Sequence, residues 1–253
     1  MTLAKKGEPI VHPTAVIEDG AVLGKNCRIG PFCVVGPEVY LGDSVRLISH
    51  VVVLGKTVIG DETVIWPFSS IGSDPQDLKF KGEKTELAIG KRNKIREGVS
   101  INPGTKGGGG ITRIGDDCLL MLGSHIGHDC QIGNSIVMAN NSAVAGHVTI
   151  EDNVTIGGLS GIHQFCRIGQ GAMIGAVSKA QPLYEKLNIA TEEIREIRSQ
   201  LDRAKELLAQ SDKAIDYWER RIKDGFGDLG PGFRDILRGQ KNVEKGGNSS
   251  FYK

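Results

Sequence analysis

The chain has 253 residues, enough for one large domain or two small ones, and its 35 glycines are about twice the usual share. Its 31 basic side chains balance 30 acidic ones, so no global field favours nucleic acid or an anionic membrane surface. No apolar stretch is long enough to span a membrane or to form a signal-peptide core, and we expect a cytoplasmic protein.

A six-residue repeat explains the glycine content. An aliphatic residue followed by glycine recurs every six residues from Leu23 to Leu41, and the aliphatic register continues to Ile71. It resumes over 89–101 and again over 114–174. So short a unit suits a brief strand and a turn, with the aliphatic side chain pointing inward. The sequence therefore predicts a mainly β protein, a parallel β-helix with triangular coils of about 18 residues.

The cysteines share one position in this repeat. The aliphatic positions of the repeat are called ladder positions below. All five cysteines lie two residues before one of them, as Cys27 does before Ile29 and Cys130 before Ile132. Residues two apart in a strand face the same side, so the thiols are predicted to fill the prism as small apolar groups. Their odd number and the lack of a C-x-x-C motif argue against a disulfide framework or a zinc clamp.

Two insertions interrupt the repeat, over Gly72–Ala88 and Asn102–Arg113. Loops ejected from a solenoid usually line its binding face. The first carries Gln76, Asp77 and Lys79, a set able to grip hydroxyls and phosphates, although a solvated charged loop explains the same composition. The second has four consecutive glycines but lacks the ending of a P-loop, and we interpret it as a flexible loop.

The third block of repeats contains most of the histidines. These are His125, His128, His147 and His163. Their spacing places them near one edge of the prism on successive coils. Such a cluster could bind a metal or act as a general base, and polar surface residues at turns are a third interpretation. Asp129 directly follows His128 and no cysteine faces outward, which favours a base oriented by an acid over a zinc site.

A helical pattern replaces the repeats after Ala180. Thr191 is a candidate N-cap, and an apolar stripe follows it. The stripe comprises Ile194, Ile197, Leu201, Leu208, Ile215, Trp218 and Ile222. We predict a β-helix domain over 1–180, a helical region of one or two helices over 181–240, and a mobile tail over 241–253.

Over about residues 8–180 the chain resembles the acyl-[acyl-carrier-protein]–UDP-N-acetylglucosamine O-acyltransferases. The resemblance is carried by the ladder together with Gln76-Asp77-Leu78-Lys79, His125-Ile126-Gly127-His128-Asp129-Cys130, Ala145-Gly146-His147-Val148 and His163-Gln164-Phe165. It implies a left-handed β-helix, an exception to the usual handedness of parallel β crossovers. It also implies a homotrimer with active sites between neighbouring prisms. The implied reaction transfers an (R)-3-hydroxyacyl chain from acyl carrier protein to the 3-hydroxyl of UDP-N-acetylglucosamine, the first step of lipid A biosynthesis.

The resemblance further implies a role for individual residues. His128 matches the general base, Asp129 supports it, and the amide of Gly146 stabilises the oxyanion. The residues that would hold substrate or acyl chain are Gln76, Asp77, Lys79, His125, His147, His163 and Gln164. Ala176 is a candidate for setting acyl length, although an ordinary solenoid filler explains it equally well. Because the thioester is already activated, no cofactor and no metal are expected.

The chain departs from the family after the last coil. The segment Ala180–Ala190 is shorter than the family's and lacks the arginine used there for nucleotide or donor contacts. Three alternatives stay open: an N-acyltransferase acting on an amino sugar nucleotide, a metal-dependent hydratase of the carbonic-anhydrase type, and a non-catalytic trimeric scaffold.

Overall fold

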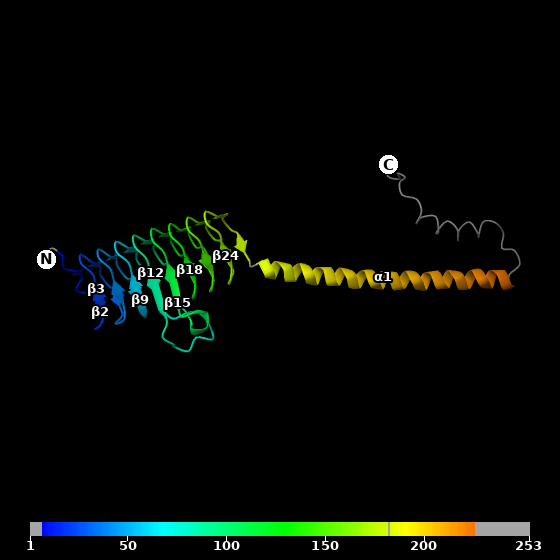
Figure 1. Ribbon diagram of the computed structural model, residues 1–253, viewed down its shortest axis with the longest axis horizontal. Coiled ribbons are helices and arrows are strands. Elements are labelled where there is room, and N and C mark those ends of the chain that lie inside the picture. Colours follow the sequence, from blue (N-terminus) through cyan, green and yellow to red (C-terminus); the bar gives the residue numbers. More distant parts are fainter. Residues whose placement is uncertain (1–6, 182, 226–253) are drawn as a thin grey trace. The chain divides into compact units, whose positions relative to one another are not determined.

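The computed structural model describes residues 7–181 and 183–225, which divide into two compact units after Lys186. The first unit is a stack of triangular coils, and in Figure 1 the coils run from blue at the N-terminal end to green at β24 (Arg167–Ile168). Its short strands form three parallel sheets, one on each face of a prism.

Each coil gives one strand to each sheet, except that the last coil gives none to sheet C. Sheet A contains β1 (Ile10–Val11), β4 (Arg28–Ile29), β7 (Arg46–Leu47), β10 (Val64–Ile65), β13 (Lys94–Ile95), β16 (Leu119–Leu120), β19 (Val137–Met138), β22 (Thr155–Ile156) and β25 (Met173–Ile174). Sheet B contains β2 (Val16–Ile17), β5 (Val34–Val35), β8 (Val52–Val53), β11 (Ser70–Ile71), β14 (Ser100–Ile101), β17 (His125–Ile126), β20 (Ala143–Val144), β23 (Gly161–Ile162) and β26 (Lys179–Ala180). Sheet C contains β3 (Val22–Leu23), β6 (Tyr40–Leu41), β9 (Lys56–Ile59), β12 (Glu86–Ile89), β15 (Ile111–Ile114), β18 (Gln131–Ile132), β21 (Thr149–Ile150) and β24.

The register of strand pairing agrees with the predicted six-residue repeat (each repeat unit is a hexad), three units of which make one coil. His125 pairs with Ala143 in the next coil, one coil length of 18 residues away. The insertions lengthen single coils, so that Ser70 pairs with Ser100 and Ser100 with His125. The prediction of a left-handed parallel β-helix is confirmed.

The ladder aliphatics and the cysteines fill the prism. Ladder residues such as Leu41, Ile65 and Ile126 are fully buried. All five cysteines are buried and free, as the repeat predicted. Burial raises the pKa of the Cys130 thiol to about 12 and that of Cys118 to about 11. Neither thiol is therefore a nucleophile at neutral pH.

At the corner between sheets C and A, carboxylate and amide side chains hold successive coils together. Asp61 Oδ1 accepts the backbone N–H of Asp43 at 3.0 Å, and Asp152 Oδ1 accepts that of Asn134 at 2.7 Å. These acceptors lie directly against the glycine of the preceding coil. A Cβ on Gly42 would stand 2.5 Å from Asp61 Oδ1 and 2.8 Å from Asp61 N. Glycine is required here for space.

Gly42→Ala is therefore expected to destabilise the prism by about 1–3 kcal/mol, because the added methyl forces the Asp61 turn to move. Gly169→Ala is the matched control. Gly169 also follows a sheet C strand, but a Cβ there meets no atom within 4 Å. Urea unfolding of the two variants should show a lower midpoint for Gly42→Ala alone; equal midpoints would contradict this explanation of the corner.

The two insertions are shorter than the sequence indicated and contact each other. Pairing in β12 and β15 begins before the next hexad, so the loops end at residues 85 and 110. The Asn102 amide Nδ2 donates to the carbonyls of Ser73 and Asp74 at 3.0 and 3.1 Å. The glycine-rich loop contains a 3-10 turn, η1 (Lys106–Gly108), and the N–H groups of Gly108 and Gly110 both donate to the Thr105 carbonyl. These two bonds close a tight turn at the tip of the loop.

Among the described residues the helical region is one long helix, α1 (Leu183–Gly225), most of which belongs to the second unit; the sequence predicted one or two helices. No helix among the described residues is long and apolar enough to cross a membrane. The predicted tail over 241–253, and residues 226–240 of the predicted helical region, lie outside the described residues.

Candidate active site

The corner between sheets B and C gathers the histidine cluster. Here the chain turns through Asp129, His147 and Phe165, which occupy the same position on successive coils and share the left-handed backbone conformation, with φ of 60°, 61° and 62°. The N–H of His147 donates to the His128 carbonyl at 2.9 Å. The rings of His128 and His147 meet edge to face, with centroids 4.9 Å apart.

Asp129 is the buried anchor of this corner. Its side chain is inaccessible to solvent, and its Oδ1 accepts the backbone N–H of Thr105 at 2.8 Å. Oδ2 accepts the Thr105 hydroxyl at 2.6 Å. The backbone N–H of Asp129 donates to Thr112 Oγ1 at 2.8 Å. A Cβ on Gly108 would overlap the carboxylate, so the glycine run allows the loop to close over Asp129.

The same carboxylate orients His128. Asp129 Oδ2 lies 2.8 Å from His128 Nδ1. A carboxylate can only accept hydrogen bonds, so Nδ1 must carry the proton and donate it. In a neutral ring this leaves Nε2 as the free lone pair. The His128 side chain is 16 % exposed, which is enough for Nε2 to meet a bound ligand.

Gly146 lies directly against that lone pair. A Cβ at Gly146 would stand 2.6 Å from both Cε1 and Nε2 of His128. Within residues 7–181 the N–H of Gly146 has no hydrogen-bond acceptor. A base and an unpaired amide donor therefore stand side by side.

His147 stands on the other side of the corner. Its ring stacks on Phe165, with centroids 4.6 Å apart and planes at 9°, and its Nδ1 lies 3.9 Å from Asp129 Oδ2. Burial lowers the pKa of His147. The negative charge of Asp129 opposes this, and His128, when protonated, lowers the pKa of His147 further by repulsion. Asp77 and Lys79 also act on His147 electrostatically, so the first insertion reaches this corner.

His125 projects from β17 beside the cluster. Its Nδ1 lies 2.8 Å from the hydroxyl of Ser100, the paired residue on β14. Burial is the main cause that lowers the pKa of His125, and repulsion from His128, when that ring is protonated, lowers it further. The ring is held neutral where a bound ligand would meet it.

A pH dependence of stability follows from the lowered pKa of His125. In the unfolded chain the His125 ring has a pKa near 6.5 and binds a proton at higher pH than it does in the folded chain. The free energy of unfolding therefore falls as the pH drops below about 6.5. His125→Gln should narrow the gap between urea midpoints measured at pH 8 and pH 5. An unchanged gap would mean that burial of His125 does not penalise its charge.

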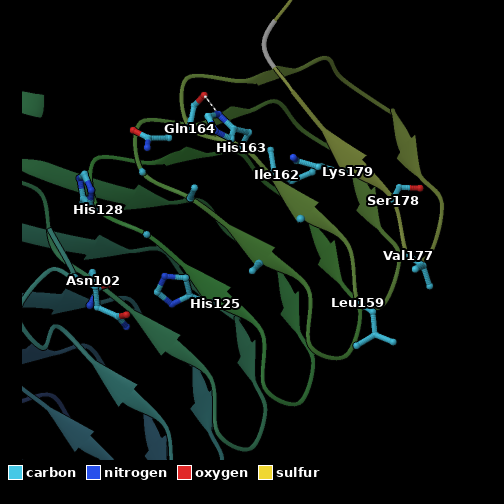
Figure 2. A pocket seen from close by; sticks show the side chains of 16 residues that line it. Asn102, His125, His128, Leu159, Ile162, His163, Gln164, Val177, Ser178 and Lys179 are labelled. Carbon is cyan, nitrogen blue, oxygen red and sulfur yellow. Dashed lines mark hydrogen bonds between the residues drawn. The ribbon is translucent and has the colours of Figure 1, made fainter. Parts of the chain in front are cut away.

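An open groove of about 680 Å³ runs along sheet B from this corner. Figure 2 shows His125 and His128 at one end and Leu159 and Val177 at the other. The polar end is lined by Gln76, Asn102, His125, His128, His163 and Gln164, and the rest by Ala143, Ala145, Leu159, Gly161, Ile162 and Val177 together with the polar Ser178 and Lys179. The groove thus joins a polar head site to a largely apolar channel.

The other predicted residues lie near the groove but do not line it. Asp77 and Lys79 belong to the first insertion, where the backbone N–H of Lys79 donates to Asp77 Oδ1 at 3.0 Å. Ala176 is exposed, and its neighbours Val177 and Ser178 line the groove instead.

Sequence reasoning missed Thr105, Thr112 and Ser100, which position Asp129 and His125. Thr105 precedes the glycine run, but no sequence signal links it to Asp129, because the contact depends on how the insertion folds back.

His128, Asp129 and His147 offer ligand atoms within 4.8 Å of one another, a spacing that could hold a metal ion. Asp129 Oδ2, however, already accepts the Thr105 hydroxyl and faces His128 Nδ1. A metal bound at His128 Nδ1 would have to displace the proton there, and one bound at Asp129 Oδ2 would compete with the Thr105 hydroxyl. The donor set fits an oriented acid–base pair better than a metal centre.

Known proteins similar to the chain share one description. No protein-family model matches it. Curated proteins named acyl-[acyl-carrier-protein]–UDP-N-acetylglucosamine O-acyltransferase are 66 % identical over 115 residues in Paracoccus denitrificans and 56 % identical over 168 residues in Aliarcobacter butzleri. These matches cover 46 % and 66 % of the chain, which spans only 44 % and 65 % of those relatives.

Solved structures extend the similarity. LpxA from Acinetobacter baumannii is 48 % identical with a TM-score of 0.67, covering 68 % of the chain and 67 % of that structure. LpxA from Moraxella catarrhalis, a UDP-N-acetylglucosamine O-acyltransferase, is 36 % identical with a TM-score of 0.66. This second match covers 92 % of the chain and 96 % of that structure.

Proposed function

The chain belongs to the UDP-N-acetylglucosamine O-acyltransferase family, and we propose that it transfers an (R)-3-hydroxyacyl chain from acyl carrier protein to the 3-hydroxyl of UDP-N-acetylglucosamine. The observation that carries the proposal is the His128–Asp129 pair, with Nε2 free beside the unpaired N–H of Gly146. This proposal makes the reaction the first step of lipid A biosynthesis.

His128 acts as the general base in this proposal. A sugar hydroxyl is almost un-ionised at neutral pH, and a positioned base contributes about 10²–10⁴-fold to its reaction. Nε2 removes the proton of the 3-hydroxyl as the oxygen attacks the thioester carbon. Asp129 stabilises the imidazolium that forms, through the 2.8 Å contact at Nδ1.

The N–H of Gly146 stabilises the charge that develops on the thioester oxygen. One such donor is worth roughly 10²–10³-fold in rate. When the tetrahedral intermediate collapses, the new C–O bond stays and the C–S bond breaks. The proton held on His128 Nε2 then passes to the departing sulfur, which restores the free base.

The remaining polar residues hold the substrates. We assign Gln76, His125, His163 and Gln164 to the polar end of the groove, and Asp77, Lys79 and His147 to its rim. The acyl chain follows the apolar channel toward Leu159 and Val177. Ala176, exposed beside Val177, stays a candidate for setting acyl length.

We also propose that the protein acts as a homotrimer in the cytoplasm. The groove is open along sheet B, and a neighbouring prism would close it and exclude water from the reacting groups. Its partners are acyl carrier protein and the UDP sugar.

Product analysis tests the proposed function. The full chain is incubated with an (R)-3-hydroxyacyl carrier protein and either UDP-N-acetylglucosamine or its 3-amino analogue. We expect an ester with the first sugar, identified by mass spectrometry and by its cleavage with hydroxylamine. An amide formed only from the amino sugar would support the N-acyltransferase instead, and no product from either sugar would support the scaffold.

A further inference from the structure

Helix α1 carries a strict seven-residue repeat. In the sequence Ile194, Leu201, Leu208, Ile215 and Ile222 recur every seven residues. A second row with the same seven-residue period lies three residues further along the chain. It comprises Ile197, Ala204, Ser211 and Trp218. This 3–4 spacing has a period of 3.5 residues, which stays on one side of a helix only when helices supercoil around each other.

Among the described residues of its own unit, nothing covers the stripe. Ile194 is 58 % exposed, Ile197 64 %, Leu208 55 % and Trp218 59 %. The helix has 43 residues and is therefore roughly 65 Å long. Helices in water derive most of their stability from packing an apolar face, so a stripe of this length requires a partner.

We propose that α1 packs against α1 of other copies of this chain as a parallel, three-stranded coiled coil. One heptad of the seam has isoleucine at both positions, Ile194 and Ile197, a combination that favours three strands over two. Leu207, 66 % exposed, flanks the seam beside Leu208 and widens the apolar face, as a helix touching two neighbours requires.

The parallel orientation rests on the proposed homotrimer. Under three-fold symmetry the three α1 helices have the same sense along the three-fold axis, so a coiled coil wound around that axis is parallel. In such an arrangement each seam residue faces its own copies, so three Ser211 side chains form one layer. The outer face carries charge, as in the Lys205–Asp202 ion pair at 3.6 Å.

Disulfide cross-linking in the full chain tests this inference. Ser211→Cys places a thiol in the seam, and Lys213→Cys places one on the outer face of the same helical turn. All five native cysteines are buried, so they do not compete. At about 10 µM chain, we expect Ser211→Cys to cross-link on the order of 10²-fold faster, because paired helices hold the thiols at millimolar effective concentration. Equal rates would overturn the coiled coil.

An adjacent aromatic pair supplies the second test. Trp218 lies in the seam and Tyr217, 54 % exposed, lies outside it. In the Ser211→Cys background, Trp218→Glu should remove the fast cross-linking and Tyr217→Glu should retain it. The same loss with both variants, or with neither, would contradict the register.

Mass by light scattering separates this inference from the proposed function. A trimer that shows no seam cross-linking would refute the coiled coil and leave the trimeric enzyme intact. Seam cross-linking in a chain that makes no acyl-transfer product would support the coiled coil and refute the proposed function.

Discussion

Replacing His128 by glutamine is expected to lower kcat for acyl transfer by about 10²–10⁴-fold. Glutamine keeps a polar side chain of similar length but cannot take a proton from the sugar hydroxyl. Because the groove is otherwise unchanged, KM for UDP-N-acetylglucosamine should change much less than kcat. Steady-state assays with a saturating acyl carrier protein give both constants.

His12→Gln is the control for this substitution. His12 is an exposed histidine before the second strand of the first coil, where its Nδ1 lies 2.9 Å from Thr14 Oγ1. Its replacement should leave kcat unchanged. If His128→Gln stays within a factor of a few of the unmodified protein, the assignment of the base is wrong.

Asp129→Asn is expected to cost kcat on the order of 10³-fold, comparable to the roughly 10⁴-fold cost of the equivalent change in a Ser-His-Asp triad. The backbone N–H of Thr105 can only donate, so the amide oxygen should take the place of Oδ1, and the Thr105 hydroxyl can turn to accept from the amide N–H₂ in the place of Oδ2. The amide N–H₂ then faces His128 Nδ1 and forces the ring proton onto Nε2. The base is blocked although no contact with substrate has changed.

Nitrogen-15 NMR of His128 separates this tautomer effect from simple loss of structure. The unmodified protein should show a protonated Nδ1 and a free Nε2, and Asp129→Asn should show the reverse. Thr105→Val should weaken the same preference and Thr105→Ser should preserve it. An Nε2-protonated ring in the unmodified protein at neutral pH would refute the proposed role of Asp129.

The β-helix could be predicted from sequence because its six-residue repeat can be recognised within short stretches of the chain. Each hexad fixes one inward aliphatic residue, and Cys27 and Cys130 follow from the same two-residue alternation. The grouping of histidines at one edge could also be predicted. When each coil has a fixed length, residues separated by about one coil length in sequence lie at the same place on adjacent coils. His128 and His147 indeed lie on adjacent coils, with ring centroids 4.9 Å apart.

The supports of the site could not be predicted in this way. Thr105 reaches Asp129 only because the glycine-rich insertion folds back onto the next coil, and its place is set by contacts 24 residues apart in sequence. Gly108 has a role for the same reason, since it gives room to the Asp129 carboxylate. An insertion has no period, so its internal contacts are visible only in the folded chain.

The pH–rate profile of kcat/KM tests most directly the claim that His128, held by Asp129, is the base of an acyl transfer. For the unmodified protein we predict a limb that falls with decreasing pH with the slope of a single proton, and His128→Gln should lack this limb. A kcat/KM of the unmodified protein that stays constant from pH 5 to pH 9, or a limb that persists in His128→Gln, would contradict the mechanism.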